Sequence, residues 1–149
     1  MAETQAGPTQ LTTFQVVFDA ADPHAAARFW AAALGYEPED NSGVVDGLLA
    51  TGHLPPESVV EVDGRSAFAD VAAASDPSGA RPRLLFQRVP ESKSVKNRVH
   101  LDLHVGADRV DAEAERLRSL GATHAWESAD RGVRCVTLRD PEGNELCLS

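Results

Sequence analysis

The stretch that decides the fold is VHLDLHVGADRVDAEAERLRSLG, residues 99–121. Its first seven residues, Val99–Val105, alternate between apolar and polar side chains, which is the pattern of a β-strand with one face in a core. The polar face carries His100, Asp102 and His104. We therefore expect a strand that presents two histidines and a carboxylate on the side away from the core.

A helix follows this strand, and the same helix signature occurs earlier in the chain. Asp108 lies 13 residues before Gly121, and Asp22 lies 13 residues before Gly35. An aspartate accepts hydrogen bonds from the free N–H groups at a helix start, and a glycine adopts the left-handed conformation after its end. Pro23 at the first helical position strengthens the first of the two predictions. The chain therefore contains two related helices.

The segments around these helices repeat as well. Phe14–Asp19 is a β-rich run before the first helix, as Val99–Val105 is before the second. The turn sequences DPSG (76–79) and DPEG (140–143) both precede a closing strand. The closing strands are predicted at Arg83–Val89 and Glu145–Ser149. Since three signals recur in the same order, the sequence predicts an α+β fold made of two βαβββ modules, whose curved mixed sheets surround a cleft.

Each module needs two further strands, which are predicted at Tyr36–Asp40 and Ser66–Ala74 in the first half and at Ala122–Trp126 and Val133–Arg139 in the second. The insertion Asn41–Arg65 separates the first pair, and a short helix is predicted within it at Gly47–Leu54. The domain boundaries follow: a disordered leader at 1–10 and a single domain at 11–149. Within that domain, module one covers about 11–90, the linker about 90–98 and module two about 98–149.

Composition narrows the range of possible functions. The chain has 149 residues, 42% of them hydrophobic and 25% charged, which is typical of a globular domain. Its net charge of −9 disfavours nucleic acid and anionic membrane surfaces as partners. Neither a membrane-spanning apolar run nor a signal peptide is recognisable, so we expect a cytoplasmic protein.

The two cysteines, Cys135 and Cys147, lack the spacing of a zinc motif. If Arg139 pairs with Glu145 across the last hairpin, Cys147 faces Thr137 and the two thiols become diagonal neighbours on one face of the sheet. That separation is too long for a disulfide, so both thiols are expected to be free.

Three groups of residues carry a resemblance to a known family. They are Asp22-Pro23 with Arg28-Phe29-Trp30 and Leu34-Gly35-Tyr36, then Leu84–Glu91 with Lys96–Leu103, and finally Asp140–Leu148. Together they resemble glyoxalase-like and bleomycin-resistance-type proteins of the vicinal-oxygen-chelate (VOC) superfamily, over residues 11–149. One such fold hosts many chemistries, so the resemblance leaves the activity open. It also implies a homodimer.

The resemblance implies where a divalent metal ion would bind. Metal-using relatives hold the ion between His or Gln on the first strand of each module and Glu on the last. Gln15 and His100 match the first-strand positions, whereas Cys147 stands where relatives carry a terminal-strand Glu, and Gln87 is the best polar candidate in the other closing strand. Glu145 lies two residues before Cys147 on the same face of that strand and is the one carboxylate that can take its place. The expected metal set is therefore Gln15, His100 and Glu145, or no metal at all, because the usual carboxylates are missing.

Two functions remain open after these observations. One is a protein that binds a small organic molecule in its cleft without the usual metal. The other is a lyase, isomerase or dioxygenase that uses a divalent ion. A domain without a ligand is a third alternative. The residues expected to line the cleft are Gln15, Gln87, His100, Asp102, His104, Trp126 and Cys147.

Overall fold

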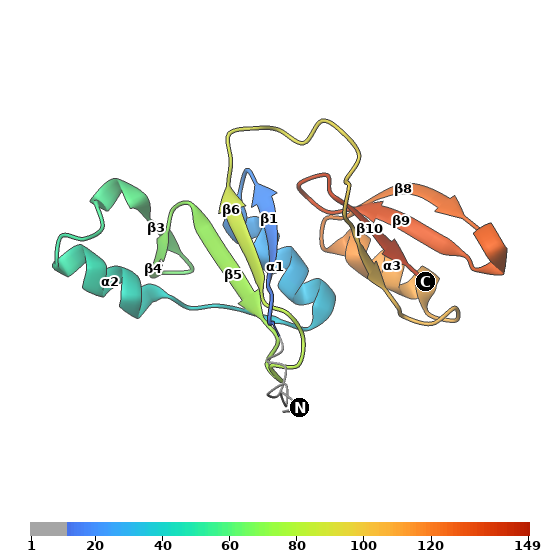
Figure 1. The fold of residues 1–149 in the computed structure, drawn as a ribbon, viewed down its shortest axis with the longest axis horizontal. Helices are drawn as coiled ribbons and strands as arrows, with labels where there is room; N and C mark the ends of the chain where they lie inside the picture. The colour runs from blue at the N-terminus through green and yellow to red at the C-terminus, as the bar shows by residue number, and fades with distance from the viewer. Residues whose placement is uncertain (1–11) are drawn as a thin grey trace, which may run out of the picture.

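The computed structural model describes residues 12–149, so the leader predicted at 1–10 lies outside the described residues. Figure 1 shows two units side by side. Module one contains β1 (Val16–Ala20), α1 (Pro23–Leu34), β2 (Glu37–Pro38), β5 (Val71–Ser75) and β6 (Leu84–Arg88). Module two contains β7 (Leu101–Leu103), α3 (Val110–Ser119), β8 (Thr123–Ser128), β9 (Cys135–Arg139) and β10 (Glu145–Leu148).

The two modules have the same topology. The first sheet has the strand order β1-β6-β5-β2, and the second has the order β7-β10-β9-β8. In each sheet the opening strand is parallel to the closing strand, and the remaining pairs are antiparallel. The prediction of two βαβββ modules is therefore confirmed.

The insertion between β2 and β5 forms structure of its own. It contains α2 (Ser42–Ala50), a 3-10 turn at Pro56–Ser58, and a hairpin of β3 (Val59–Val62) and β4 (Arg65–Phe68). The helix begins five residues before the predicted Gly47, where Asp40 accepts a hydrogen bond from the Ser42 backbone N–H. The predicted strand Ser66–Ala74 is two strands, because the chain turns between Phe68 and Val71.

The two main helices differ in how they begin. Asp22 caps α1 as predicted, accepting from the backbone N–H groups of His24 and Ala25, and Gly35 ends the helix at a φ of +67°. The corresponding prediction for Asp108 is wrong. The second helix begins at Val110, its N-cap residue is Arg109, and no side chain caps it. The spacing repeats, but the capping contact does not.

The opening strand of module two is shorter than predicted. β7 spans only Leu101–Leu103, and Val99 is 78% exposed rather than part of the core stripe. Val99 lies at the end of the linker, two residues before β7 begins. Leu101, Leu103 and Val105 do pack against the core as expected.

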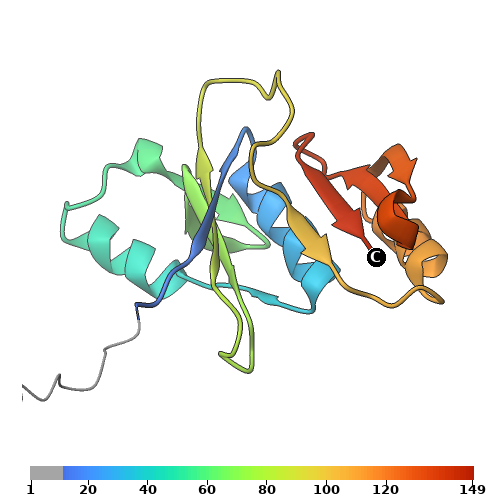
Figure 2. The same cartoon turned by 45° about the vertical axis from the view of Figure 1, so that its right-hand side comes forward.

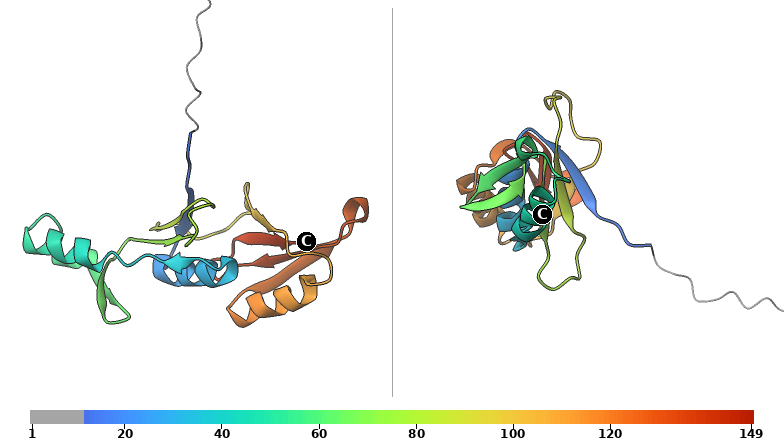
Figure 3. Two further views of the ribbon diagram at one scale, coloured as in Figure 1. Left: turned by 90° about the horizontal axis from the view of Figure 1, so that it is seen from below. Right: turned by 90° about the vertical axis from the view of Figure 1, so that its left-hand side faces the viewer.

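Helix α1 lies between the two sheets, as Figures 1 and 2 show, and it joins both modules in one apolar core. Trp30 on this helix is 1% exposed, and its ring contacts those of Phe18 and Phe29. Figure 3 shows an elongated molecule with the insertion at one end and the turn between β8 and β9 at the other. No helix among residues 12–149 is long and apolar enough to cross a membrane.

The repeated Asp-Pro turns share a structural role. Asp76 accepts hydrogen bonds from the backbone and side chain of Ser78 and from Arg81. Asp140 accepts from the backbone N–H groups of Glu142 and Asn144. Both aspartates are buried, so each turn is organised around an enclosed carboxylate that satisfies its own chain.

The Asp76 turn is expected to make the free energy of unfolding depend on pH. The hydrogen bonds from Arg81 and then from Ser78 hold the pKa of Asp76 well below its usual range. Because the folded pKa lies below the unfolded one, Asp76 stabilises the protein above about pH 4, and this contribution is lost as the pH falls. When urea unfolding is measured between about pH 6 and 2, the free energy of unfolding should fall less with decreasing pH in Asp76→Asn than in the wild type. Asp46→Asn, on the exposed side of α2, is the control; an Asp76→Asn profile identical to the wild type would contradict the assignment.

Candidate functional site

The open face of the second sheet brings the predicted polar residues together. Leu146 and Leu148 of β10 point into the core, so Cys147 between them points to the opposite side. In the parallel pairing of β7 and β10, Cys147 lies opposite Asp102. His100 lies one residue before β7. It is two residues from Asp102, and this spacing places both side chains on the same face of an extended chain.

His100, Asp102 and Cys147 form a compact group. Nδ1 of His100 lies 2.7 Å from Oδ1 of Asp102. One donor atom from each of the three residues lies within 4.8 Å of the others. The Sγ of Cys147 also lies 3.3 Å from the hydroxyl oxygen of Thr137, its partner across the β9–β10 hairpin. The predicted hairpin register is therefore confirmed, and it fixes the position of the thiol.

The second cysteine lies next to this group. Both thiols are free, as predicted. Burial raises the pKa of Cys135 to about 11, and the neighbouring Cys147 and Asp102 contribute in the same direction. Asp102, Cys135 and Cys147 line a hollow of about 670 Å³, together with Ser128, Asp130, Arg131, Val133 and Ser149.

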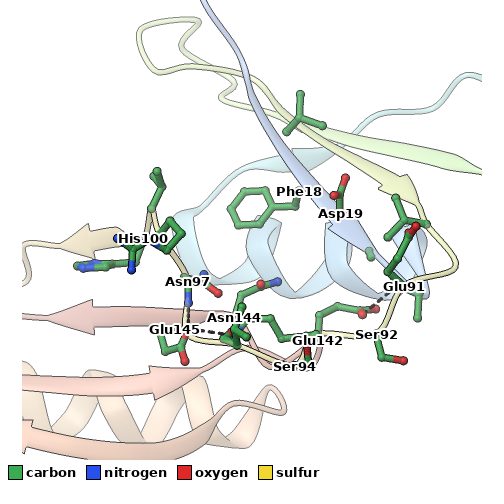
Figure 4. A pocket seen from close by; sticks show the side chains of 18 of the residues that line it. Phe18, Asp19, Glu91, Ser92, Ser94, Asn97, His100, Glu142, Asn144 and Glu145 are labelled. Atoms are coloured by element: carbon green, nitrogen blue, oxygen red, sulfur yellow. Dashed lines mark hydrogen bonds and ion pairs between the residues drawn. The ribbon is translucent and has the colours of Figure 1, made fainter.

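A larger cavity of about 740 Å³ lies between the modules. Figure 4 shows Phe18 and Asp19 of β1 on one side of it and His100 on the other, with the linker along the edge. Asn97 and Asn144 contribute polar groups from the linker and from the last turn of module two. The cavity therefore combines an aromatic ring, amides, an imidazole and carboxylates from both halves of the chain.

Glu145 is held by the linker. Its side chain is 6% exposed and accepts hydrogen bonds from the Asn97 backbone N–H at 2.9 Å and from Lys93 Nζ at 3.2 Å. Burial alone would raise the pKa of Glu145, but these donors outweigh it and the pKa is lowered. The carboxylate is thus ionised and engaged by the protein itself.

The two glutamines are also engaged. Gln15 is exposed, lies just before β1, and accepts a hydrogen bond from Arg83 at 2.9 Å. Arg83 in turn forms a bidentate ion pair with Glu39. Gln87 donates to Asp19 at 2.9 Å. Gln87 therefore lies on the first sheet and Gln15 next to it, and the hydrogen bonds of both are separate from the His100 group.

The remaining predicted cleft residues lie on the second sheet. Nδ1 of His104 is 3.1 Å from the Ser149 hydroxyl oxygen. Trp126 pairs with Thr137 in the β8–β9 ladder, is 38% exposed, and has Lys96 and Arg139 each 5.8 Å from its ring centre. Trp126 thus shares the face that carries Cys147, at its outer edge.

Sequence reasoning missed the contribution of the linker. Lys93 and Asn97 belong to a short basic run that is typical of a solvated connector, yet both bind Glu145. Phe18, which has the alternation of a core residue, also lines the larger cavity. For the linker, the only signal in the sequence was that Asn97 lies close to the opening strand of module two.

Comparisons with known proteins agree with this architecture. The family of glyoxalase-like domains matches residues 15–149. A search of curated proteins finds no match. Among solved structures, the fosfomycin resistance protein FosX from Mesorhizobium loti superimposes with a TM-score of 0.59 at 13% identity, covering 95% of this chain and 91% of FosX. The bleomycin-binding protein from Streptomyces verticillus, complexed with copper(II)-bleomycin, gives a TM-score of 0.53 at 17% identity, covering 95% of this chain and 98% of that protein.

The residues present do not fit the hard metal ion of such relatives. FosX from Listeria monocytogenes, with a TM-score of 0.58 at 12% identity over 95% of this chain and 92% of its own, was solved with Mn(II). Manganese prefers carboxylate, carbonyl and water oxygens. Here Cys147 offers sulfur at the terminal-strand position, and Glu145 is bound to Lys93 and Asn97.

Fold and sequence lead to one assignment. The paired βαβββ modules match solved VOC structures over nearly their whole length, and the family match spans both modules. This chain belongs to the glyoxalase-like domain family of the VOC superfamily.

Proposed function

We propose that this protein binds a small organic molecule in the cavity between its modules, without the carboxylate metal site of its metal-using relatives. The observation that carries this proposal is the cavity itself, about 740 Å³ with walls from both modules. Sites for small molecules usually have volumes of this order and combine apolar walls with a few polar groups. Phe18 supplies an aromatic surface, while Asn97, His100 and Asn144 supply hydrogen-bonding groups.

The charges of the cavity favour a neutral or cationic molecule. Its walls include four carboxylates, those of Asp19, Glu91, Glu142 and Glu145, against the side chains of Lys93 and Arg98. Two of these groups neutralise each other, since Lys93 pairs with Glu145. Glu142 is bound to the backbone N–H groups of Ala21 and Asp22. A negative balance remains, which disfavours anionic ligands.

The binding site can be located by NMR with a library of flat aromatic fragments, neutral and cationic. Bound fragments should shift the backbone resonances of Phe18, Asn97, His100 and Asn144 most. Ser94→Trp, on the linker wall, should weaken binding about 10-fold or more by filling the cavity, whereas Ala50→Trp, at the exposed end of α2, should not. Hits that cluster elsewhere, or that bind equally to both variants, would contradict the proposal. Sedimentation velocity on the same samples tests the accompanying proposal of a homodimer. It is favoured by the exposed side chains of Phe14 and Val17, since β1 is an edge strand of its sheet among residues 12–149.

The alternative is a lyase, isomerase or dioxygenase that binds a hard divalent ion at Gln15, His100 and Glu145. It requires Glu145 to leave Lys93 and Asn97, and Gln15 to leave Arg83. If Mn(II) binds with one ion per chain and His100→Ala abolishes that binding, the alternative is correct and the first proposal is wrong about the metal. We expect Mn(II) to leave the melting temperature unchanged.

A further inference from the structure

We propose that residues 90–99 form a strap over the cavity between the modules, and that Glu145 is the latch that holds this strap closed. The inference rests on the proposed function, because it concerns how a molecule enters and leaves that cavity. Every residue of the strap except Lys96 lines the cavity. In Figure 4 the strap runs along the edge of the cavity, with Asn97 next to Glu145.

The strap is anchored at its two ends and is loosely held between them. Just before it, the backbone N–H of Val89 donates to the Ala20 carbonyl at 3.1 Å, and β7 begins at Leu101 after it. The strap itself contains no helix or strand, and among residues 12–149 no backbone-to-backbone hydrogen bond involves it. Segments of this kind open locally at a low cost in free energy. The strap can therefore move while both modules stay folded.

Two groups of the strap bind the same oxygen of Glu145. The backbone N–H of Asn97 donates to Oε2 at 2.9 Å, and Nζ of Lys93 donates to it at 3.2 Å. Within the described part of the chain, these are the only hydrogen bonds that join the strap to the modules. The position of Glu145 is fixed, because its strand β10 is hydrogen-bonded to β7 on one side and to β9 on the other. A single rigid carboxylate therefore holds the strap.

The latch favours the closed strap. Hydrogen bonds to an ionised group are stronger than those between neutral groups, and opening would leave the Glu145 carboxylate, which is 6% exposed, without its donors. Both bonds must therefore break in the same event. Val95 and Val99 line the cavity and are 72% and 78% exposed, so the strap presents apolar surface to a molecule held there. Opening of the latch should then set how fast such a molecule enters and leaves.

Hydrogen exchange of the Asn97 amide, followed by NMR on the full-length protein alone, measures how often the strap opens. Lys93→Met removes the ammonium group and keeps most of the aliphatic stem. Because both bonds break together, the Asn97 amide should exchange about 10-fold faster in this variant than in the wild type. Lys93→Arg keeps the charge, and Lys96→Met removes a cation of the strap that Glu145 does not bind. Both controls should exchange within about 3-fold of the wild type.

Entry into the cavity can be measured with TEMPOL, a small neutral nitroxide that relaxes the protons it approaches and needs no affinity for the protein. The ring protons of Phe18, which lines the cavity, should be relaxed about 3-fold more strongly in Lys93→Met than in the wild type. Lys96→Met should leave this relaxation unchanged. The ring of Phe29, which is 4% exposed in the core, should be relaxed equally in all variants, and this equality shows that the core stays folded.

Two results would overturn the proposal: Asn97 exchange that is equal in the wild type and Lys93→Met, or Phe18 relaxation that is equal in both. Glu145→Gln should change both quantities in the same direction as Lys93→Met. If Glu145→Gln does not fold, Lys93→Met decides, because Lys93 lies outside both sheets.

Neither measurement contains an aromatic fragment, so this inference and the proposed function can fail separately. Fragments that do not bind to a protein whose strap opens as expected would contradict the proposed function. Fragments that bind in the cavity beside a strap that does not respond to Lys93→Met would contradict the latch alone.

Discussion

Asp140→Ala is expected to lower the free energy of unfolding by about 3 kcal/mol. Asp140 is 4% exposed and accepts a hydrogen bond at 2.9 Å from the indole N–H of Trp30, which lies on the helix between the modules. It also accepts from the backbone N–H groups of Glu142 and Asn144. Burial raises the pKa of Asp140, against the lowering effect of these donors. Truncation would leave the indole N–H buried without an acceptor, and such a group is costly in a core.

Urea unfolding of Asp140→Ala, Trp30→Phe and the double variant measures the pair directly. Trp30→Phe removes the indole donor, so the effect of Asp140→Ala should be smaller by about 1–2 kcal/mol in that background. Asp46→Ala, at an exposed position of α2, should change stability by less than about 0.5 kcal/mol. Strictly additive effects of the two substitutions would show that the contact between the modules contributes nothing.

Phe86→Ala is expected to cost about 4 kcal/mol, the largest effect of any substitution considered. Phe86 is fully buried in the central strand β6, and its ring stacks on that of Phe18 with centroids 5.2 Å apart. Phe18 in turn contacts Trp30 at 5.1 Å. The substitution removes the middle of this aromatic row and leaves a cavity that a rigid sheet cannot fill.

Val44→Ala, on the exposed side of α2, is the control, because Val44 is 57% exposed. Its stability should lie within about 0.5 kcal/mol of the wild type in the same urea titration. Because Phe18 lines the cavity between the modules, Phe86→Ala should also weaken fragment binding there. A loss of less than about 2 kcal/mol would mean that the aromatic row closes around the gap.

Two residues of the closing strand β10, Glu145 and Cys147, connect stability with function. Glu145 stabilises the linker through Lys93 and Asn97, so its carboxylate is already used within the fold. Cys147 keeps its thiol on the open face, next to Asp102 and His100. The closing strand β10 thus keeps its place in the fold while it offers a thiol, rather than a free carboxylate, on its open face.

Local patterns in the sequence determined the elements of this fold. Asp22 caps the start of the first helix and Gly35 its end, through contacts within a few residues. The ends of this helix can therefore be predicted from the spacing of the two residues. The Arg139–Glu145 pairing follows in the same way from a tight turn between adjacent strands. The two-module architecture was predictable because duplication repeats these local signals. Where the signal was weaker, as at Asp108, the predicted cap was wrong.

Only the tertiary structure decided which functional groups meet. Asp102 and Cys147 come together because β7 and β10 pair in parallel across 45 residues of sequence, and no local pattern encodes that contact. The burial of Glu145 likewise depends on where the linker crosses module two, since the linker has no periodicity of its own. Spacing along the chain fixes short-range hydrogen bonds, whereas the neighbours of an exposed strand face are set by the packing of distant segments, and that packing is decided by the whole core.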